Sequence, residues 1–126
     1  MLTLLSIRDI LIIDQLELGF AAGLNIFTGE TGAGKSILMD SLGFVLGWRG
    51  RGDLVRSGAE KGEVTAIFEL SNDHLALDVL RKAGLQDGLD LIIRRGNAKD
   101  GRKTAWINDR RVSGDLLRNV SKHLVE

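Results

Sequence analysis

The 126-residue sequence contains no cysteine and no proline, and its aromatic residues are two tryptophans and four phenylalanines. Without cysteine, the chain can form neither a disulfide framework nor a thiolate metal site, which fits a reducing compartment. Because proline is absent, most turns are expected at the 16 glycines. The scarcity of aromatic residues also argues against a surface that stacks on single-stranded nucleic acid.

The sequence also lacks an excess of either charge, since 17 basic residues balance 17 acidic ones. A net charge of zero gives no general sign of a nucleic-acid or membrane binder. No apolar run approaches the ~20 residues that cross a bilayer, and the N-terminus lacks the pattern of a signal peptide. We therefore expect a cytoplasmic globular chain with no membrane partner, forming one domain or part of a larger one.

Hydrophobic periodicity predicts strands and helices in a mixed order. Alternation of apolar and polar residues predicts strands, and a wider spacing predicts helices. The predicted strands are 2–7, 10–20, 24–28, 64–70, 89–95 and 104–108, and the predicted helices are 35–46, 74–83 and 113–124. A long connection is expected over 47–62. This order predicts an α/β or α+β fold in which helices are layered on a mixed sheet.

Several residues have the chemistry of turns and helix caps. Gly47 is expected to end the first helix, and Asn72 or Asp73 to cap the second. Ser113 is the expected N-cap of the third helix, and Asn108-Asp109 suits a tight turn.

A glycine-rich octet between the third strand and the first helix carries the most specific chemistry. It reads Gly29-Glu30-Thr31-Gly32-Ala33-Gly34-Lys35-Ser36 and matches the Walker A pattern in full. The glycines let backbone N–H groups approach phosphate oxygens at the positive end of the following helix. Lys35 would reach the β- and γ-phosphates, and the Ser36 hydroxyl would be a ligand of Mg²⁺. We expect this octet, called the phosphate loop below, to bind ATP with Mg²⁺, with Glu30 turned away from the phosphates.

The acidic partner that hydrolysis needs is missing after the phosphate loop. Such a carboxylate holds Mg²⁺ or activates water, usually at the end of an apolar strand. The run 10–13 leads into Asp14, but it precedes the loop, whereas 89–93 runs into Arg94 and Arg95. We therefore assign no catalytic residue to this chain and expect binding without efficient hydrolysis.

Residues 23–42 and 100–108 closely resemble the RecN family of bacterial DNA repair proteins, which is similar to SMC proteins and other ABC-type repair ATPases. The resemblance implies that residues 1–126 form the N-terminal segment of an ABC/SMC-type ATPase head. It implies a distant C-terminal segment as a partner, homodimers of ATP-engaged heads, and action on DNA double-strand ends in repair and recombination in the bacterial nucleoid. A small P-loop kinase or a non-catalytic nucleotide-binding dimerisation module is the alternative.

Basic residues cluster near the end of the sequence and could contact DNA. Between positions 94 and 111 there are seven basic residues and two acidic ones. The basic residues are Arg94, Arg95, Lys99, Arg102, Lys103, Arg110 and Arg111, and the acidic residues are Asp100 and Asp109. Arg102 and Lys103 are the candidate DNA contacts, although a solvated hairpin explains the same charges.

Two further residues have open roles. Arg56 falls where SMC-like heads carry a functional arginine, so it is a candidate for contact with nucleotide or DNA. Trp48 could stack on adenine, or it could pack at the end of the helix.

Overall fold

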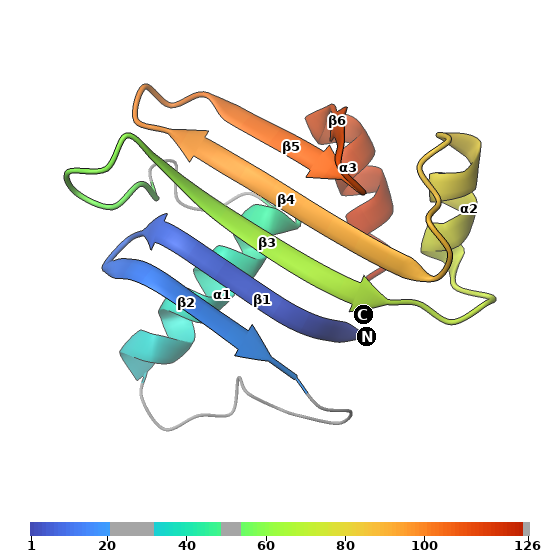
Figure 1. Ribbon diagram of the computed structural model, residues 1–126, viewed down its shortest axis with the longest axis horizontal. Helices are drawn as coiled ribbons and strands as arrows, with labels where there is room; N and C mark the ends of the chain where they lie inside the picture. The colour runs from blue at the N-terminus through green and yellow to red at the C-terminus, as the bar shows by residue number, and fades with distance from the viewer. Residues whose placement is uncertain (21–31, 49–53, 125–126) are drawn as a thin grey trace.

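The computed structural model describes residues 1–20, 32–48 and 54–124, which form one antiparallel sheet and three helices (Figure 1). The strands are β1 (Leu2–Ile10), β2 (Ile13–Gly19), β3 (Lys61–Glu69), β4 (Asp90–Ala98), β5 (Lys103–Ile107) and β6 (Arg110–Val112). The helices are α1 (Gly32–Val45), α2 (Leu75–Lys82) and α3 (Gly114–Ser121). The strand order is β2-β1-β3-β4-β5-β6, and all five ladders are antiparallel. The expected layered α+β architecture is confirmed, while the run 24–28 lies outside the described residues.

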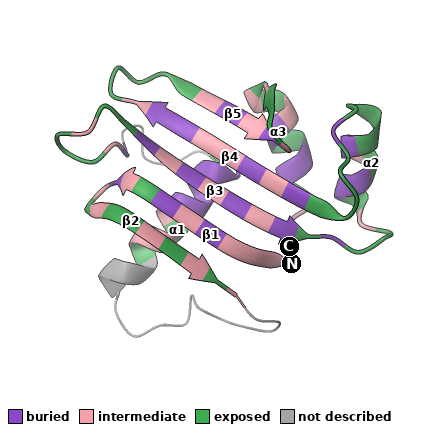
Figure 2. Ribbon diagram, in the orientation of Figure 1, coloured by how far each residue is buried: buried purple, intermediate pink, exposed green. Residues whose placement is uncertain are grey.

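The hydrophobic core lies between the sheet and the helices. In Figure 1, α1 passes behind the sheet, and α3 lies behind its β5 side. Alternate residues of the four central strands are buried, and Figure 2 colours them as purple bands. These core residues are Leu5, Ile7, Val64, Ala66, Phe68, Leu91, Ile93, Ala105 and Ile107. The period-2 pattern of the sequence therefore sets which face of the sheet is buried.

The first hairpin differs from the prediction. Strands were expected over 2–7 and 10–20, but β1 continues to Ile10 and pairs there with Ile13. The apolar run between them is a two-residue turn, in which Leu11 takes a φ of 54°. The Leu11 N–H donates to the Leu54 carbonyl at 2.7 Å, so a distant segment holds this unfavourable backbone conformation in place.

Strand β3 begins three residues before the predicted position, because Gly62 belongs to the strand and not to the loop. A Cβ atom at Gly62 would lie 2.5 Å from the Asp9 carbonyl oxygen and 2.6 Å from Ile10 Cδ1. Glycine at this position therefore allows the end of β1 to fold closely over β3.

The second helix is capped by His74 and not by Asn72 or Asp73. His74 Nδ1 accepts a hydrogen bond from the Ala76 N–H at 3.0 Å, while the Asp73 carboxylate accepts one from the Ser71 hydroxyl at 2.9 Å. Asp73 is thus engaged in the preceding turn, one position too early to cap the helix.

The predicted cap of α3 is confirmed, since the Ser113 hydroxyl accepts from the Leu116 N–H at 3.1 Å. The helix ends at Ser121, before the predicted residue 124. The turn at Asn108 and Asp109 is also confirmed, with φ values of 48° and 67°. The Asn108 side chain donates to the Leu85 carbonyl at 2.7 Å, which fastens this turn to the rest of the fold.

Candidate nucleotide site

The phosphate loop lies at the start of α1. Gly29, Glu30 and Thr31 are outside the described residues, and α1 begins at Gly32, three residues before the predicted start. Gly32 to Lys35 form its first turn, and the positions of their side chains are outside what the structure describes. That turn carries no acidic residue, so no carboxylate in it neutralises the positive end of the helix dipole. The backbone of this helix start has the chemistry of an anion site.

Helix α1 is exposed near the phosphate loop and buried at its other end. Ser36, the expected Mg²⁺ ligand, is exposed, and so is Met39. From Ser41 onward every residue through Gly47 is buried. The Ser41 hydroxyl satisfies its hydrogen-bonding capacity by donating to the Ile37 carbonyl at 2.8 Å. The expected burial of this helix is therefore confirmed for its C-terminal half.

Trp48 folds back onto the C-terminal turn of α1. Its N–H donates to the Gly43 carbonyl at 2.9 Å after a turn at Gly47, whose φ is 81°. A Cβ atom at Gly43 would lie 3.1 Å from Trp48 Cε3, so the missing side chain makes room for the indole. Gly43 lies seven residues after Ser36, so about 10 Å of helix separates the Trp48 ring from the phosphate loop. This placement favours the packing role of Trp48 over adenine stacking.

Arg95 completes the buried end of α1, a role that the sequence did not reveal. Its Nη1 donates to the Phe44 carbonyl at 2.8 Å, and its guanidinium lies 4.8 Å from the centre of the Phe44 ring. Burial, with a smaller contribution from Arg118, lowers the pKa of Arg95. A cation at a helix C-terminus stabilises the exposed carbonyl dipoles. Counting Arg95 within a surface patch was therefore wrong.

The basic cluster is divided between the two faces of the sheet. Arg94 pairs across strands with Trp106, and Trp106 pairs with Arg111, so these three residues share the face that the described helices leave open. The Arg94 guanidinium lies 4.2 Å from the Trp106 ring centre, within cation–π distance. Arg95 lies on the opposite face, because neighbouring residues of a strand alternate.

Arg102 and Lys103 lie on the hairpin between β4 and β5. Arg102 Nε is 2.8 Å from Asp100 Oδ2, and the Arg102 N–H donates to Asp100 Oδ1 at 3.0 Å. That backbone hydrogen bond is the main cause of the lowered pKa of Asp100, with the Arg102 charge adding to it. Asp100 thus neutralises part of the Arg102 charge within the turn. Lys103 is exposed at the start of β5.

Arg56 contacts the first hairpin. Its Nη1 lies 3.7 Å from Asp9 Oδ1 and 3.9 Å from Asp14 Oδ1, and its N–H donates to the Asp9 carbonyl at 2.8 Å. Asp14 comes from the edge strand β2 and its side chain is 79% exposed. This position differs from the end of a buried strand, where a Mg²⁺-binding carboxylate is expected.

The described part of the chain lacks a metal-binding cluster and a membrane-spanning helix. Among residues 1–20, 32–48 and 54–124, no cluster of three or more histidine, cysteine or acidic side chains could hold a metal ion. None of the helices in these ranges has the length and apolar character needed to cross a membrane.

Known sequences similar to this chain include several DNA repair proteins named RecN. The chain is 42% identical to RecN of Xylella fastidiosa strain Temecula1 over 126 residues, which is 100% of this chain and 23% of that protein. It is 35% identical to RecN of Bacillus subtilis over 127 residues, again 100% of this chain and 22% of that protein. The chain therefore spans about a quarter of the length of these relatives.

Solved structures show the same fold at low sequence identity. An SMC ATPase from work on ATP-driven dimerization and DNA-stimulated activation aligns with a TM-score of 0.78 at 22% identity, covering 97% of this chain and 78% of that one. The recombination mediator protein RecF aligns with a TM-score of 0.70 at 19% identity, covering 93% of this chain and 29% of that one. The predicted SMC-type head fold is confirmed.

The match to a family model agrees with these similarities. The AAA domain model covers residues 4–122, which is nearly the whole chain. This chain therefore belongs to the AAA domain family, and its sequence is similar to the RecN proteins over about a quarter of their length.

Proposed function

We propose that this chain binds ATP and Mg²⁺ through the phosphate loop, as the nucleotide-binding segment of a RecN-type ATPase head that acts in DNA double-strand break repair and recombination. The observation that carries the proposal is the complete Walker A octet at the start of α1. Backbone N–H groups of the loop and the helix start would hold the phosphates. Lys35 would neutralise the β- and γ-phosphates, and Ser36 would contribute an oxygen ligand to Mg²⁺.

Hydrolysis is proposed for the assembled head and not for this chain alone. The relatives are about four times longer, and the sequence after the phosphate loop offers no suitable carboxylate. A C-terminal segment of the same head would supply the missing groups, and two ATP-engaged heads would form a homodimer. ATP-driven dimerization and DNA-stimulated activation are ascribed to the SMC ATPases that share this fold, which supports the proposal.

DNA contact is proposed for the open face of the sheet and its adjoining hairpin. Arg94, Trp106 and Arg111 form a basic and aromatic row on that face, and Lys103 lies at its margin. Phosphate contacts from such cations would position double-stranded DNA without reading its sequence. Arg102 contributes less, because Asp100 neutralises it. Arg56 remains a candidate contact to nucleotide or DNA whose present partners are Asp9 and Asp14.

Binding of ATP by the Lys35→Ala variant tests the nucleotide site. Loss of a charge-assisted contact to phosphate is worth about 1.5–3 kcal/mol, so the dissociation constant should rise at least about tenfold. Titration calorimetry with MgATP measures this change. Lys99→Ala is the matched control, since Lys99 is exposed on the β4–β5 hairpin, outside the loop. Equal affinities for the wild type and Lys35→Ala would refute the proposal.

Turnover separates the proposed head from the two alternatives. ATP hydrolysis that starts only when the C-terminal segment is added supports a split ATPase head. Phosphate transfer to a small acceptor by this chain alone would identify a small P-loop kinase. ATP binding without turnover in either setting would identify a non-catalytic nucleotide-binding module.

A further inference from the structure

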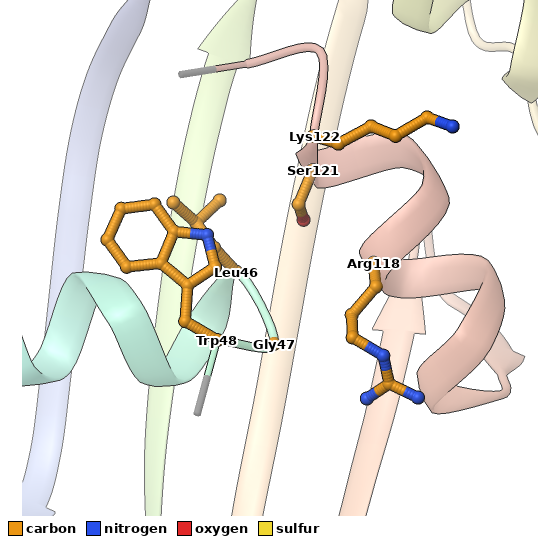
Figure 3. Close-up of a pocket in the computed structure, with 6 residues that line it drawn as sticks. All are labelled: Leu46, Gly47, Trp48, Arg118, Ser121 and Lys122. Atoms are coloured by element: carbon orange, nitrogen blue, oxygen red, sulfur yellow. The ribbon is translucent and has the colours of Figure 1, made fainter. Parts of the chain in front are cut away.

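A cavity lies at the other end of α1 from the phosphate loop, between the end of that helix and α3. Its volume is about 470 Å³, within the range of small-molecule sites. The described residues that line it are Leu46, Gly47, Trp48, Arg118, Ser121 and Lys122 (Figure 3). Leu46 lies ten residues after Ser36, which is about 15 Å along a helix, so this cavity is separate from the proposed nucleotide site.

The floor of the cavity contains a hydroxyl group that makes no hydrogen bond. Ser121 is 1% exposed, and its Oγ, which is closed to water, has no hydrogen-bond partner among the described residues. Figure 3 shows this oxygen pointing into the space between Trp48 and the Arg118 side chain. Buried polar groups are nearly always paired, and an unpaired one needs an explanation. A ligand oxygen that enters from the cavity and displaces the atoms covering Ser121 would supply the missing partner.

The charge around the cavity is positive. Arg118 and Lys122 line it, and no acidic residue is among its described lining residues. Among the residues that the structure describes, Arg118 pairs with the Asp115 carboxylate at 2.6 Å, and the Asp115 side chain is 94% exposed to solvent. Arg118 also acts on Arg95, where, after burial, it is the second cause of the lowered pKa. Two guanidinium groups that repel each other would be stabilised by an anion beside them.

One wall of the cavity is aromatic. Trp48 packs against Gly43, yet the residue remains 39% exposed, so part of its ring is open to a ligand. Figure 3 shows the indole across the cavity from Arg118, with Ser121 between them. An aromatic surface opposite a cation and a hydroxyl suits a ligand with a flat ring at one end and an oxyanion at the other.

We propose that this cavity binds a small aromatic oxyanion, such as an aromatic phosphate monoester. The oxyanion accepts hydrogen bonds from the Ser121 hydroxyl and the Arg118 guanidinium, and the ring packs beside Trp48. Lys122 adds long-range attraction, because Figure 3 shows its amino group directed away from the indole. The site is independent of the phosphate loop, so each of the two proposals can fail without the other.

Phenyl phosphate is a suitable probe, observed through the indole N–H signals of the 126-residue chain by NMR. The two tryptophans give two such signals, which Trp48→Phe assigns. The titration uses a Lys35→Ala background, which suppresses phosphate binding at the loop. We expect a saturable shift of the Trp48 signal and a constant Trp106 signal. Inorganic phosphate and benzyl alcohol, which each lack half of the ligand, should bind at least about tenfold more weakly.

Two variants and one matched control assign the binding to this cavity. Arg118→Gln and Ser121→Ala should each weaken phenyl phosphate binding about tenfold, as expected for losing one hydrogen bond to a charged group. Arg81→Gln is the control, because Arg81 also pairs with an aspartate three residues earlier, Asp78, at 3.0 Å, but does not line the cavity. Its binding should equal that of the parent.

Stability measurements separate ligand binding from a purely structural role. Ser121→Ala removes an unpaired buried hydroxyl, so the ligand-free chain should unfold at the same or a higher urea concentration than the parent. A Ser121→Ala chain that folds normally and binds phenyl phosphate as well as the parent would overturn the proposal. Equal shifts of both indole signals, or no shift of either, would also overturn it.

Discussion

The two ends of α1 differ in how far they are buried. At its N-terminal end, Ser36 is exposed and the first turn belongs to the phosphate loop. At its C-terminal end, residues 41–47 are buried, and Arg95 binds the Phe44 carbonyl. A site that rests on a rigid element holds its ligand groups more accurately than one on a free loop. The buried end therefore anchors the helix, and this anchoring would hold the other end in position for the proposed ligand.

The glycines at the two ends serve different purposes. In the proposed role of the phosphate loop, glycine would let backbone N–H groups approach phosphate, so the ligand would select the residue type. At the buried end, Gly43 leaves room for the Trp48 ring, and Gly47 lies against Leu117 and Arg118 of α3. There the neighbouring side chains select glycine. Substitutions at the two ends should therefore affect different properties of the chain.

Gly47→Ala should produce the largest loss of stability and separate the two ends most clearly. Alanine would keep an unfavourable φ of 81°, and its Cβ would lie 3.1 Å from Leu117 Cδ2. We expect the free energy of unfolding to fall by about 2–3 kcal/mol, from backbone strain plus overpacking. Urea denaturation measures the loss, while the ATP dissociation constant of the folded chain should stay unchanged.

Gly84→Ala is the matched control for that experiment. Gly84 has a similar φ of 74°, but no atom lies within 4 Å of an added Cβ. It should lose only the backbone contribution of about 1–2 kcal/mol. If the two variants were equally stable, contact with α3 would have no part in anchoring α1.

Arg95→Met should have the next largest effect, because it removes the cation at the buried end of α1. Losing the hydrogen bond to the Phe44 carbonyl should lower the free energy of unfolding by about 1–2 kcal/mol. Arg94→Met, one residue away on the open face, should cost only about 0.5–1 kcal/mol through its contact with Trp106. Thermal and urea denaturation of both variants give the comparison. A larger loss for Arg94→Met would contradict the assigned role of Arg95.

Asp109→Gly should have the smallest effect, in the opposite direction. Asp109 is exposed and has a φ of 67°, a conformation in which glycine is less strained than aspartate. We expect stability to rise by about 0.5 kcal/mol, measured by urea denaturation. This gain would show that backbone conformation at position 109 limits the stability of the turn, whereas packing limits stability at the buried end of α1. A loss of stability would instead indicate that the Asp109 side chain makes a contact important for the fold.

Features that depend on neighbours in sequence were predicted well. The Ser113 cap and the turn at Asn108 and Asp109 each depend on residues within a few positions of one another. The alternation in β1, β3, β4 and β5 likewise revealed the core face of the sheet. Short-range chemistry decides these features before the rest of the chain is in place.

Features that depend on distant contacts were missed. The turn at Leu11 needs the Leu54 carbonyl, and Gly62 is required by the Asp9 carbonyl that lies over it. The sequence predicted Arg95 as a surface cation, but in the fold its side chain donates to the Phe44 carbonyl of α1. No local pattern distinguishes these residues, because their partners lie dozens of positions away in the sequence, or in an adjoining strand.

The sequence by itself determined the chemistry of the N-terminal end of α1, because an octet of consecutive residues contains all the groups that a phosphate requires. It also determined the alternating core and the RecN-type resemblance. Only the tertiary structure decided that Trp48 packs away from the phosphate loop, that Arg94 and Arg95 serve opposite faces, and that Ser121 lies unpaired in a positive cavity. Burial and electrostatic potential at these sites depend on neighbours from several strands and helices, which come together only when the chain folds.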